Sequence, residues 1–364
     1  MVTGAIAHVV GARPNFMKAA PVVRAVAALG RRQVLIHTGQ HYDTGMSDVF
    51  FSELNLPAPD LNLGVGSGSH ASQTAALLIR LEQAFLELQP SIVVVYGDVN
   101  SSVAAALVAV KLGIPIGHVE AGLRSFDMTM PEEVNRRVTD LLSDLCFVTS
   151  PEAIGHLARE GVAAERIFFV GNPMIDTLLA NLAKFEPGPI RDRLGLGPDY
   201  ALATLHRPSN VDAPGDARRI VAALNELVEL IPVVLPLHPR GRPTLEAAGL
   251  LPSDRLVIIE PLGYVEFMSL VRGAKLVVTD SGGVQEETTI LNVPCLTIRP
   301  NTERPITISH GTNRLVTPDD LVRVARATLD GSLAQPVERP PLWDGQAGPR
   351  IAAILAAFLG ADRD

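Results

Sequence analysis

Two short apolar runs joined by an alanine-rich segment constrain the fold of this chain more than any other feature. The runs, at residues 92–96 and 114–119, are rich in β-branched residues and lie between glycine and proline, as buried parallel strands usually do. Residues 101–112 between them predict a helix that returns the chain, so that both strands run in the same direction. The sequence therefore predicts an α/β fold with parallel sheets.

Acidic residues follow both runs. Asp98 follows the first and Glu120 the second, so their carboxylates should lie at one edge of the sheet, where open α/β sheets bind ligands. Glu132 and Glu133 open the next helix, behind Pro131. An acid at a strand end or in a first helical turn is often a cap or a solvated charge, and Glu133 is the one that we expect to be only a first-turn charge. Three acids that converge on one edge favour a catalytic site.

Length and composition limit the class of protein. At 364 residues the chain is long for one domain, so two domains are expected. The formal net charge of -8 argues against nucleic acid or an anionic membrane as a partner, and no apolar run approaches the ~18 residues of a membrane span. Cys146 and Cys295 lie in apolar runs and no secretion signal is recognisable, so we expect buried free thiols in a cytoplasmic protein.

The first half of the chain alternates strands with helices. Strands are expected at 5–10, 33–37, 145–149 and 167–170, and helices at 16–29, 73–88 and from 131 to about 144. Arg13 and Lys18 are the charges of the turn and helix after the first strand, a layout that can bind phosphate although GxGxxG and GxxxxGK are absent. Gly66, Gly68 and Ala71 have GxGxxA spacing, but no buried strand precedes them, so we expect a loop there.

A proline- and glycine-containing break at residues 185–190 marks a domain boundary. We expect an N-terminal Rossmann-like domain at 1–185 with the carboxylates, a C-terminal one at 186–340, and a helix within 341–364 that packs back across the domains. The second half repeats the order strand, polar turn, helix. Its strands are expected at 200–205, 233–237, 256–259, 275–279 and 295–299, with a long helix at 211–230.

A second candidate site lies in this half. Ser281, Gly282 and Gly283 stand where a helix begins after a strand, so free N–H groups and the helix dipole favour an anion such as pyrophosphate. Glu287, about one turn further, is placed to accept hydrogen bonds from ribose hydroxyls. Neighbouring donors are His206, Arg207 and Arg304. Because no CxxC motif occurs, we expect no metal, and a diphosphate would be stabilised by arginines, His206 and amide dipoles.

An anion site in one domain and carboxylates in the other suggest a nucleotide-sugar held with its anomeric carbon near the acids. Eight motifs, spread in order over nearly the whole chain, resemble those of the non-hydrolysing UDP-N-acetylglucosamine 2-epimerases. They are GARPNFMKAAP, HTGQHYD, VYGDVNSS, HVEAGLRSFDMTMPEEVNRR, VGNPMID, LHRPSN, DSGGVQEE and RPNTERPIT. The resemblance implies a GT-B fold, two Rossmann-like domains with a cleft between them, in a homodimer. It also implies no cofactor, and reversible conversion of UDP-GlcNAc to UDP-ManNAc through 2-acetamidoglucal for cell-surface polysaccharide biosynthesis.

The resemblance also assigns residues. It implies that the catalytic residues are Asp98, Glu120, Glu132, Arg136 and His206. It implies that the substrate-binding residues are Arg13, Lys18, Asp98, Glu120, His206, Phe267, Ser281, Gly282, Gly283, Glu287 and Arg304. Which acid serves which face of C2 stays open. Leu262 stands where a glutamine often contacts the uracil, so that contact would come from the backbone or elsewhere. Gln40 and His41 match only part of the activator site of some members, so activation by UDP-GlcNAc stays open.

Three alternatives stay open. The segment FDMTMPEE also resembles relatives that act on UDP-2,3-diacetamido uronic acids, so the substrate is less constrained than the reaction. A GT-B glycosyltransferase shares the fold and the UDP site, and would need an acceptor. A non-catalytic nucleotide-sugar sensor would bind UDP and turn nothing over.

Overall fold

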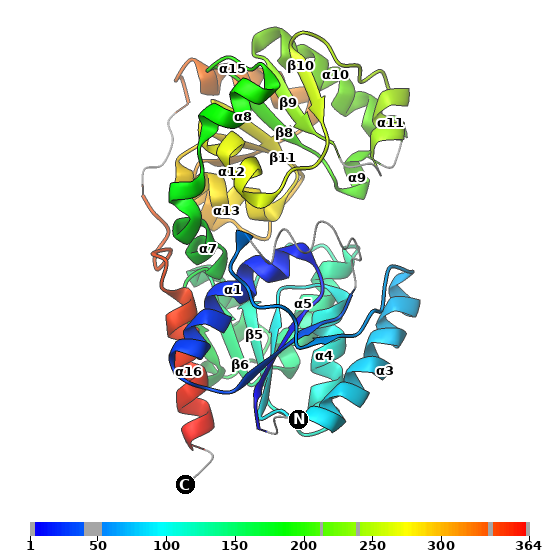
Figure 1. The fold of residues 1–364 in the computed structure, drawn as a ribbon. Coiled ribbons are helices and arrows are strands. Elements are labelled where there is room, and N and C mark those ends of the chain that lie inside the picture. The colour runs from blue at the N-terminus through cyan, green and yellow to red at the C-terminus, as the bar shows by residue number, and fades with distance from the viewer. Residues whose placement is uncertain (1–3, 40–52, 212–213, 238–240, 334–337, 362–364) are drawn as a thin grey trace. The chain divides into compact units, whose positions relative to one another are not determined.

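The computed structural model describes residues 4–39, 53–211, 214–237, 241–333 and 338–361. The chain divides into two compact units, each built on one parallel sheet (Figure 1). Unit 1 is Met1–Ala180 with Pro341–Asp364, and unit 2 is Asn181–Pro340. The predicted α/β class with parallel sheets is confirmed.

Unit 1 contains a seven-stranded sheet with the order β3-β2-β1-β4-β5-β6-β7, and every neighbouring pair is parallel. The strands are β1 (Ile6–Val10), β2 (Gln33–His37), β3 (Leu61–Asn62), β4 (Ile92–Tyr96), β5 (Ile116–Ala121), β6 (Leu145–Val148) and β7 (Ile167–Phe169). The strand order reverses between β1 and β4. Ligands of open α/β sheets bind beyond the carboxyl ends of the strands at such a switch point.

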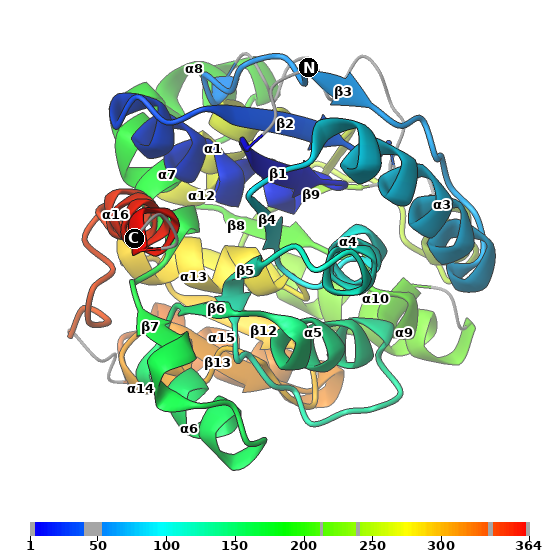
Figure 2. The same ribbon diagram turned by 90° about the horizontal axis from the view of Figure 1, so that it is seen from below.

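Helices cover both faces of this sheet, with α1, α7 and α16 on one face and α3, α4 and α5 on the other (Figure 2). Their bounds are α1 (Arg13–Ala28), α3 (His70–Leu88), α4 (Asn100–Lys111), α5 (Pro131–Leu142), α6 (Pro151–Arg159), the 3₁₀ turn η1 (Ala164–Arg166), α7 (Pro173–Asn181) and α16 (Ala347–Ala361). The predicted alanine-rich crossover is α4. Because its buried face consists largely of alanine, α4 packs close to β1 and β4.

The C-terminal segment packs on unit 1. Asp176 accepts hydrogen bonds from the N–H groups of Ala347 (3.1 Å) and Gly348 (2.7 Å), which begin α16. A Cβ atom on Gly348 would lie 2.7 Å from the carbonyl oxygen of Pro21, so α16 contacts α1 closely. Trp343, just before α16, is 1% exposed, and its indole N–H donates to the Thr149 carbonyl at 2.9 Å. Trp343 and the buried side of α16 are therefore part of the unit 1 core.

Replacing Trp343 by alanine is expected to lower the free energy of unfolding of unit 1 by about 3–5 kcal/mol, because it leaves a large cavity. Trp343→Phe keeps most of the buried ring and should cost about 1–2 kcal/mol, mainly for the lost hydrogen bond. Urea unfolding followed by circular dichroism measures both. Trp343 is the single tryptophan of the chain, so wild-type fluorescence also reports when this segment leaves its site. Equal stability of the alanine variant and wild type would contradict the packing.

Unit 2 contains a six-stranded parallel sheet with the order β10-β9-β8-β11-β12-β13, so its switch point lies between β8 and β11. The strands are β8 (Ala201–Thr204), β9 (Val233–Pro236), β10 (Leu256–Ile259), β11 (Leu276–Thr279), β12 (Cys295–Ile298) and β13 (Asn313–Val316). The helices are α8 (Pro187–Leu194), α9 (Pro208–Val211), α10 (Pro214–Leu230), α11 (Arg242–Ala247), α12 (Tyr264–Gly273), α13 (Gly282–Leu291), α14 (Ile306–Ser309) and α15 (Leu321–Leu329), with 3₁₀ turns η2 (Leu182–Lys184) and η3 (Pro318–Asp320).

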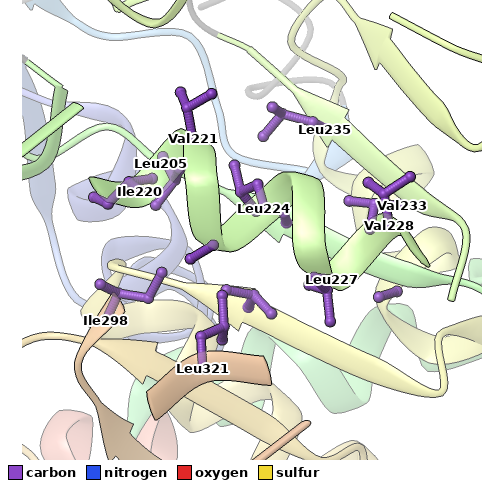
Figure 3. Close-up of a cluster of buried hydrophobic side chains, with 14 of the residues drawn as sticks. Leu205, Ile220, Val221, Leu224, Leu227, Val228, Val233, Leu235, Ile298 and Leu321 are labelled. Carbon is purple, nitrogen blue, oxygen red and sulfur yellow. The ribbon is translucent and has the colours of Figure 1, made fainter. Parts of the chain in front are cut away.

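The core of unit 2 forms under α10 (Figure 3). Ile220, Leu224 and Leu227 recur at helical spacing and are all buried, and they belong to one cluster with Leu235 of β9 and Leu321 of α15. Each such side chain contributes about 1.5–3 kcal/mol when it is fully buried. The long helix predicted over 211–230 corresponds to α10, which begins at Pro214, where proline suits the first turn, and ends at Leu230 as predicted. Val211 is the last residue of α9.

Candidate active site

Polar residues gather at the switch point of each sheet. In unit 1 they lie in the segments after β1, β4 and β5, and in unit 2 in the segments after β8 and β11. The topology therefore gives each unit one ligand-binding edge, and these two edges contain most of the residues that the sequence singles out.

In unit 1 the buried carboxylate of Glu120 is paired with Lys18. The ammonium group of Lys18, in the second turn of α1, donates to Oε2 of Glu120, and the two residues are 5% and 4% exposed. A buried charge that is paired in this way is held firmly, because removing either partner leaves the other uncompensated. The Glu120 carboxylate is therefore fixed in position.

Glu120 does not follow its strand, as the sequence predicts, but lies within it. β5 runs to Ala121, and its register with β6 shifts between Val119 and Ala121, so Glu120 is the extra residue of a bulge. Its φ is 75°, a strained value for a residue other than glycine. Bulges redirect side chains and occur next to active sites. The strand prediction is wrong here because apolar periodicity carries no signal for a bulge.

Gly97 brings the chain close to this ion pair. Its φ is 63°, and a Cβ atom there would lie 2.8 Å from Nζ of Lys18 and 3.1 Å from Oε2 of Glu120. Asn15 fixes the surrounding backbone, since it accepts from the N–H of Gly11 at 3.0 Å and donates to the Tyr96 carbonyl at 2.7 Å. The turns after β1 and β4 are thus tied together beside the ion pair.

Asp98, at the end of β4, has a cation of its own. Arg136 of α5 contacts Oδ2 of Asp98 at 2.5 Å and Oε2 of Glu133 at 2.5 Å. Glu133 also accepts from the N–H and hydroxyl of Ser125, both at 2.9 Å, and is fully buried. The prediction that Glu133 is only a first-turn charge is therefore wrong, because this residue anchors Arg136 and the segment before α5. A run of two glutamates does not reveal which one points inward.

The other predicted residues of unit 1 are placed differently. Glu132 is exposed on the first turn of α5, and no hydrogen bond or ion pair joins it to another described residue. The described contacts thus bring Asp98 and Glu120 to one edge but do not connect Glu132 with them. Arg13 begins α1, and its side chain lies outside the described structure, as do Gln40 and His41.

In unit 2, Asp280 organises the switch point. It follows β11, is fully buried, and accepts from the N–H groups of His206 (3.0 Å) and Arg207 (2.9 Å) and from the side-chain amide of Asn210 (3.0 Å). Burial alone would raise the pKa of Asp280, but the hydrogen bond and charge of His206 outweigh it and lower the pKa. Nδ1 of His206 lies 2.8 Å from the carboxylate, so Nε2 is left for a ligand. Asp280 is not among the residues predicted from the sequence, although the acid of DSGG directly after a strand indicates a residue at the ligand-binding edge.

The predicted anion site at residues 281–283 coincides with the start of α13. Ser281 is the N-cap and Gly282 the first helical residue, so the first N–H groups lack intrahelical acceptors. Arg304 lies against this turn, where its Nε contacts Glu286 at 2.9 Å and its Nη1 contacts Glu303. A Cβ atom on Gly282 would collide with the Arg304 guanidinium and come 2.9 Å from Oε1 of Glu303. A larger residue here would fit only if the Arg304 side chain moved away from the start of α13.

Glu287 is a buried acid one turn into α13. Burial raises its pKa to about 8, a hydrogen bond with Tyr264 opposes this shift, and the charge of Glu286 adds to it. Its Oε1 has no hydrogen-bond partner among the described residues. An unsatisfied buried acceptor fits a ligand that supplies hydroxyl groups. Phe267, half-buried on α12, is in the same unit.

The raised pKa of Glu287 predicts that the free energy of unfolding depends on pH. From its ordinary pKa of 4.5 to its folded pKa of about 8 the folded state holds a proton that the unfolded state has lost, so stability falls as pH rises through this window. We expect Glu287→Gln to be a few kcal/mol more stable than wild type at about pH 8.5 and nearly equal at about pH 5. Thermal unfolding at both pH values measures this, with the exposed Glu82→Gln as control for charge loss. A pH-independent difference would contradict the assignment.

Two kinds of site are absent from the described residues. They contain no group of three or more histidine, cysteine, aspartate or glutamate residues that could hold a metal ion. In the same part of the chain no helix is both long and apolar enough to cross a membrane. Cys146 and Cys295 are buried free thiols, as predicted.

The fold and the two edges define the class of protein. Two doubly wound parallel sheets, each with charged residues at its switch point, form a GT-B-like α/β protein. The family model described as UDP-N-acetylglucosamine 2-epimerase matches residues 26–356. The chain therefore belongs to the UDP-N-acetylglucosamine 2-epimerase family, as its motifs predict.

Individual relatives agree with this assignment. The chain is 42% identical over 359 residues to a UDP-N-acetylglucosamine 2-epimerase of Methanocaldococcus jannaschii, covering 95% of this chain and 97% of the relative. It is also 42% identical over 357 residues to a UDP-2,3-diacetamido-2,3-dideoxy-D-glucuronate 2-epimerase of Pseudomonas aeruginosa, covering 96% and 99%. The solved structure of the M. jannaschii enzyme in complex with UDP-GlcNAc and UDP matches with a TM-score of 0.90 at 41% identity, covering 97% of this chain and 99% of that one.

Proposed function

We propose that this protein interconverts UDP-GlcNAc and UDP-ManNAc by eliminating UDP and adding it back to 2-acetamidoglucal. The observation that carries the proposal is the pair of carboxylates at the switch point of unit 1, Asp98 and Glu120, each paired with its own cation. Membership of the family supports the reaction, and the M. jannaschii relative supports the substrate.

Two acids suit the chemistry of C2. The hydrogen on C2 has no neighbouring carbonyl to acidify it, so direct removal would be very slow. When the bond between C1 and the diphosphate oxygen stretches first, positive charge spreads over C1 and the ring oxygen, and carboxylates stabilise that charge and take the proton. The C1–O and C2–H bonds break, a C1–C2 double bond forms, and UDP leaves. Re-addition of UDP with protonation on the other face inverts C2, which requires acid/base groups on both faces.

Asp98, Glu120 and Glu132 are the groups that we propose for proton transfer. Glu120 is buried and paired with Lys18, and Asp98 is partly exposed and paired with Arg136, so each acid is held in position by a cation of its own. Glu132 is included because it matches the acidic motif of the family, and its assignment rests on that match alone.

Unit 2 contains most of the residues that we propose to bind UDP. The N–H groups at the start of α13, together with Arg304 and His206, are positive groups suited to the diphosphate, which becomes more negative as the C1–O bond breaks. The unsatisfied oxygen of Glu287 suits the ribose hydroxyls. We assign Phe267, with Arg13 and Lys18 of unit 1, to substrate binding by their match to the family motifs.

Incubation with UDP-GlcNAc in deuterated water tests the function. We expect UDP-ManNAc to form without an acceptor or added cofactor, with deuterium at C2 of both sugars, as detected by NMR and mass spectrometry. Turnover only in the presence of an acceptor would favour a glycosyltransferase. UDP binding without any turnover would favour a sensor, and either outcome would overturn the proposal.

The similarity to a second relative favours a second candidate substrate, a UDP-2,3-diacetamido uronic acid. The P. aeruginosa relative that acts on a diacetamido glucuronate is as similar to this chain as the M. jannaschii enzyme is, at 42% identity. The same assay with UDP-2,3-diacetamido-2,3-dideoxyglucuronate decides between the two substrates by the ratio of kcat/KM. We further propose a cytoplasmic homodimer in cell-surface polysaccharide biosynthesis, supported by the motif resemblance. Light scattering after gel filtration tests the dimer.

A further inference from the structure

A buried histidine joins the two acid-bearing segments of unit 1. His118 lies in β5, two residues before Glu120, and is 0% exposed. Its Nε2 lies 2.9 Å from the carbonyl oxygen of Gly97, the residue before Asp98. Its Nδ1 lies 2.7 Å from Oδ1 of Asp140 on α5. One side chain therefore contacts the backbone of the β4 end and a carboxylate on another element.

Asp140 connects His118 to the backbone on the far side of Glu120. Its Oδ2 accepts from the N–H of Gly122 at 3.1 Å, two residues after Glu120, and contacts Arg124 at 2.7 Å. Arg124 is in turn held by Glu160 at 2.5 Å. Starting from Gly97, the contacts run through His118 and Asp140 to Gly122. They span the residues on either side of the bulge that holds Glu120.

The partners fix the protonation of His118. The carbonyl of Gly97 can only accept, so Nε2 carries hydrogen. Burial alone would raise the pKa of Asp140, but the charge and hydrogen bond of His118, together with Arg124, lower it, so Asp140 is ionised and also accepts. His118 therefore donates from Nε2 to the Gly97 carbonyl, and its Nδ1 lies against the Asp140 carboxylate.

We propose that His118, held by Asp140, is a positioning residue that fixes the backbone under both catalytic carboxylates, Asp98 and Glu120. It touches neither acid, and acts through the Gly97 carbonyl and, by way of Asp140, the Gly122 N–H. Gly97 itself borders the Lys18 and Glu120 ion pair, so a shift of its peptide moves both acids. This inference rests on the proposed function, because it concerns the same reaction.

Two variants test it by kinetics. His118→Phe keeps a ring of similar size but removes both hydrogen-bonding nitrogens. We expect kcat to fall about 10–100-fold, with KM and the Kd for UDP within about threefold, because sub-ångström misplacement affects the chemical step. His118→Gln places an amide N–H where Nε2 lies, and should recover about tenfold of that loss. His8→Phe is the matched control. His8 is an equally buried histidine of β1, and its Nδ1 lies 2.7 Å from the hydroxyl of Tyr96.

A purely structural histidine would give a different result. It would lower the melting temperature of both His118 variants and leave kcat per folded molecule unchanged, and this would overturn the proposal. If His118→Phe does not fold, His118→Gln decides alone, since a fall in kcat of more than about tenfold despite its amide N–H would overturn the role of donation to Gly97.

A readout without turnover separates this inference from the proposed function. In protein labelled with ¹⁵N-histidine, and with the His118 signals assigned by their loss in His118→Gln, Nε2 of His118 is expected to carry hydrogen, because the Gly97 carbonyl that faces it can only accept. An Nε2 without hydrogen would overturn the positioning role even in an active enzyme. A wild-type protein that is inert toward both UDP-sugars would overturn the proposed function while leaving this measurement valid.

Discussion

Glu120→Gln is expected to reduce the rate of epimerisation by about 10³-fold or more, while the affinity for UDP stays within about threefold of wild type. The amide keeps the shape of the side chain and an oxygen that can accept from Lys18, but it cannot take a proton from C2 or offset positive charge at C1. UDP affinity should be retained because the groups that we propose to bind the diphosphate lie in unit 2.

Deuterium exchange at C2 measures this prediction more sharply than product formation, because it reports proton transfer itself. Asp98→Asn should show a comparable loss, and the exposed Glu82→Gln on α3 serves as a control that changes charge outside the site. Thermal unfolding must accompany each assay, because Lys18 loses its buried counter-ion in Glu120→Gln and the protein is expected to lose stability. Wild-type exchange rates in a folded Glu120→Gln protein would exclude Glu120 as a catalytic acid.

The architecture of both units was largely predictable from local sequence. Buried parallel strands are continuous apolar runs, and those of β2, β4 and β10 coincide with the predicted ranges. The missed strand β3 has two residues, one of them exposed, so it has no apolar run to detect. Similarly, β13 combines asparagine and arginine with two apolar residues, and its place in the sheet depends on pairing with β12.

The site was predictable as a set of residues but not as a set of contacts. Parallel topology places Asp98 and Glu120 at one edge, and this follows from sequence order alone. The bulge at Glu120, the burial of Glu133 and the hydrogen bonds to Asp280 depend on packing between elements that are distant in the chain. Asp280 shows why contacts could not be predicted. From the sequence alone, this acid after a strand cannot be distinguished from a solvated charge, because the N–H groups that surround it are not known.

Gly282→Ala is expected to weaken UDP binding by about 10–100-fold, which corresponds to one or two charge-assisted hydrogen bonds. The new methyl group would occupy space held by the guanidinium of Arg304, and it would lie 2.9 Å from Oε1 of Glu303. Arg304 is fixed by Glu286 and Glu303, so it can yield only by breaking one of these ion pairs. We expect it to shift away from the start of α13, where it contributes to the anion site.

Gly188→Ala is the matched control for this substitution. Gly188 also lies in the first turn of a helix of unit 2, α8, and a Cβ atom there meets nothing within 4 Å. Alanine should stabilise that helix by about 0.5–1 kcal/mol and leave UDP binding unchanged. Calorimetric titration with UDP compares the two variants with wild type. Equal affinity in all three would mean that the diphosphate does not bind at the α13 N-terminus, whereas loss in Gly282→Ala alone would locate the anion site there, independently of any effect on the carboxylates of unit 1.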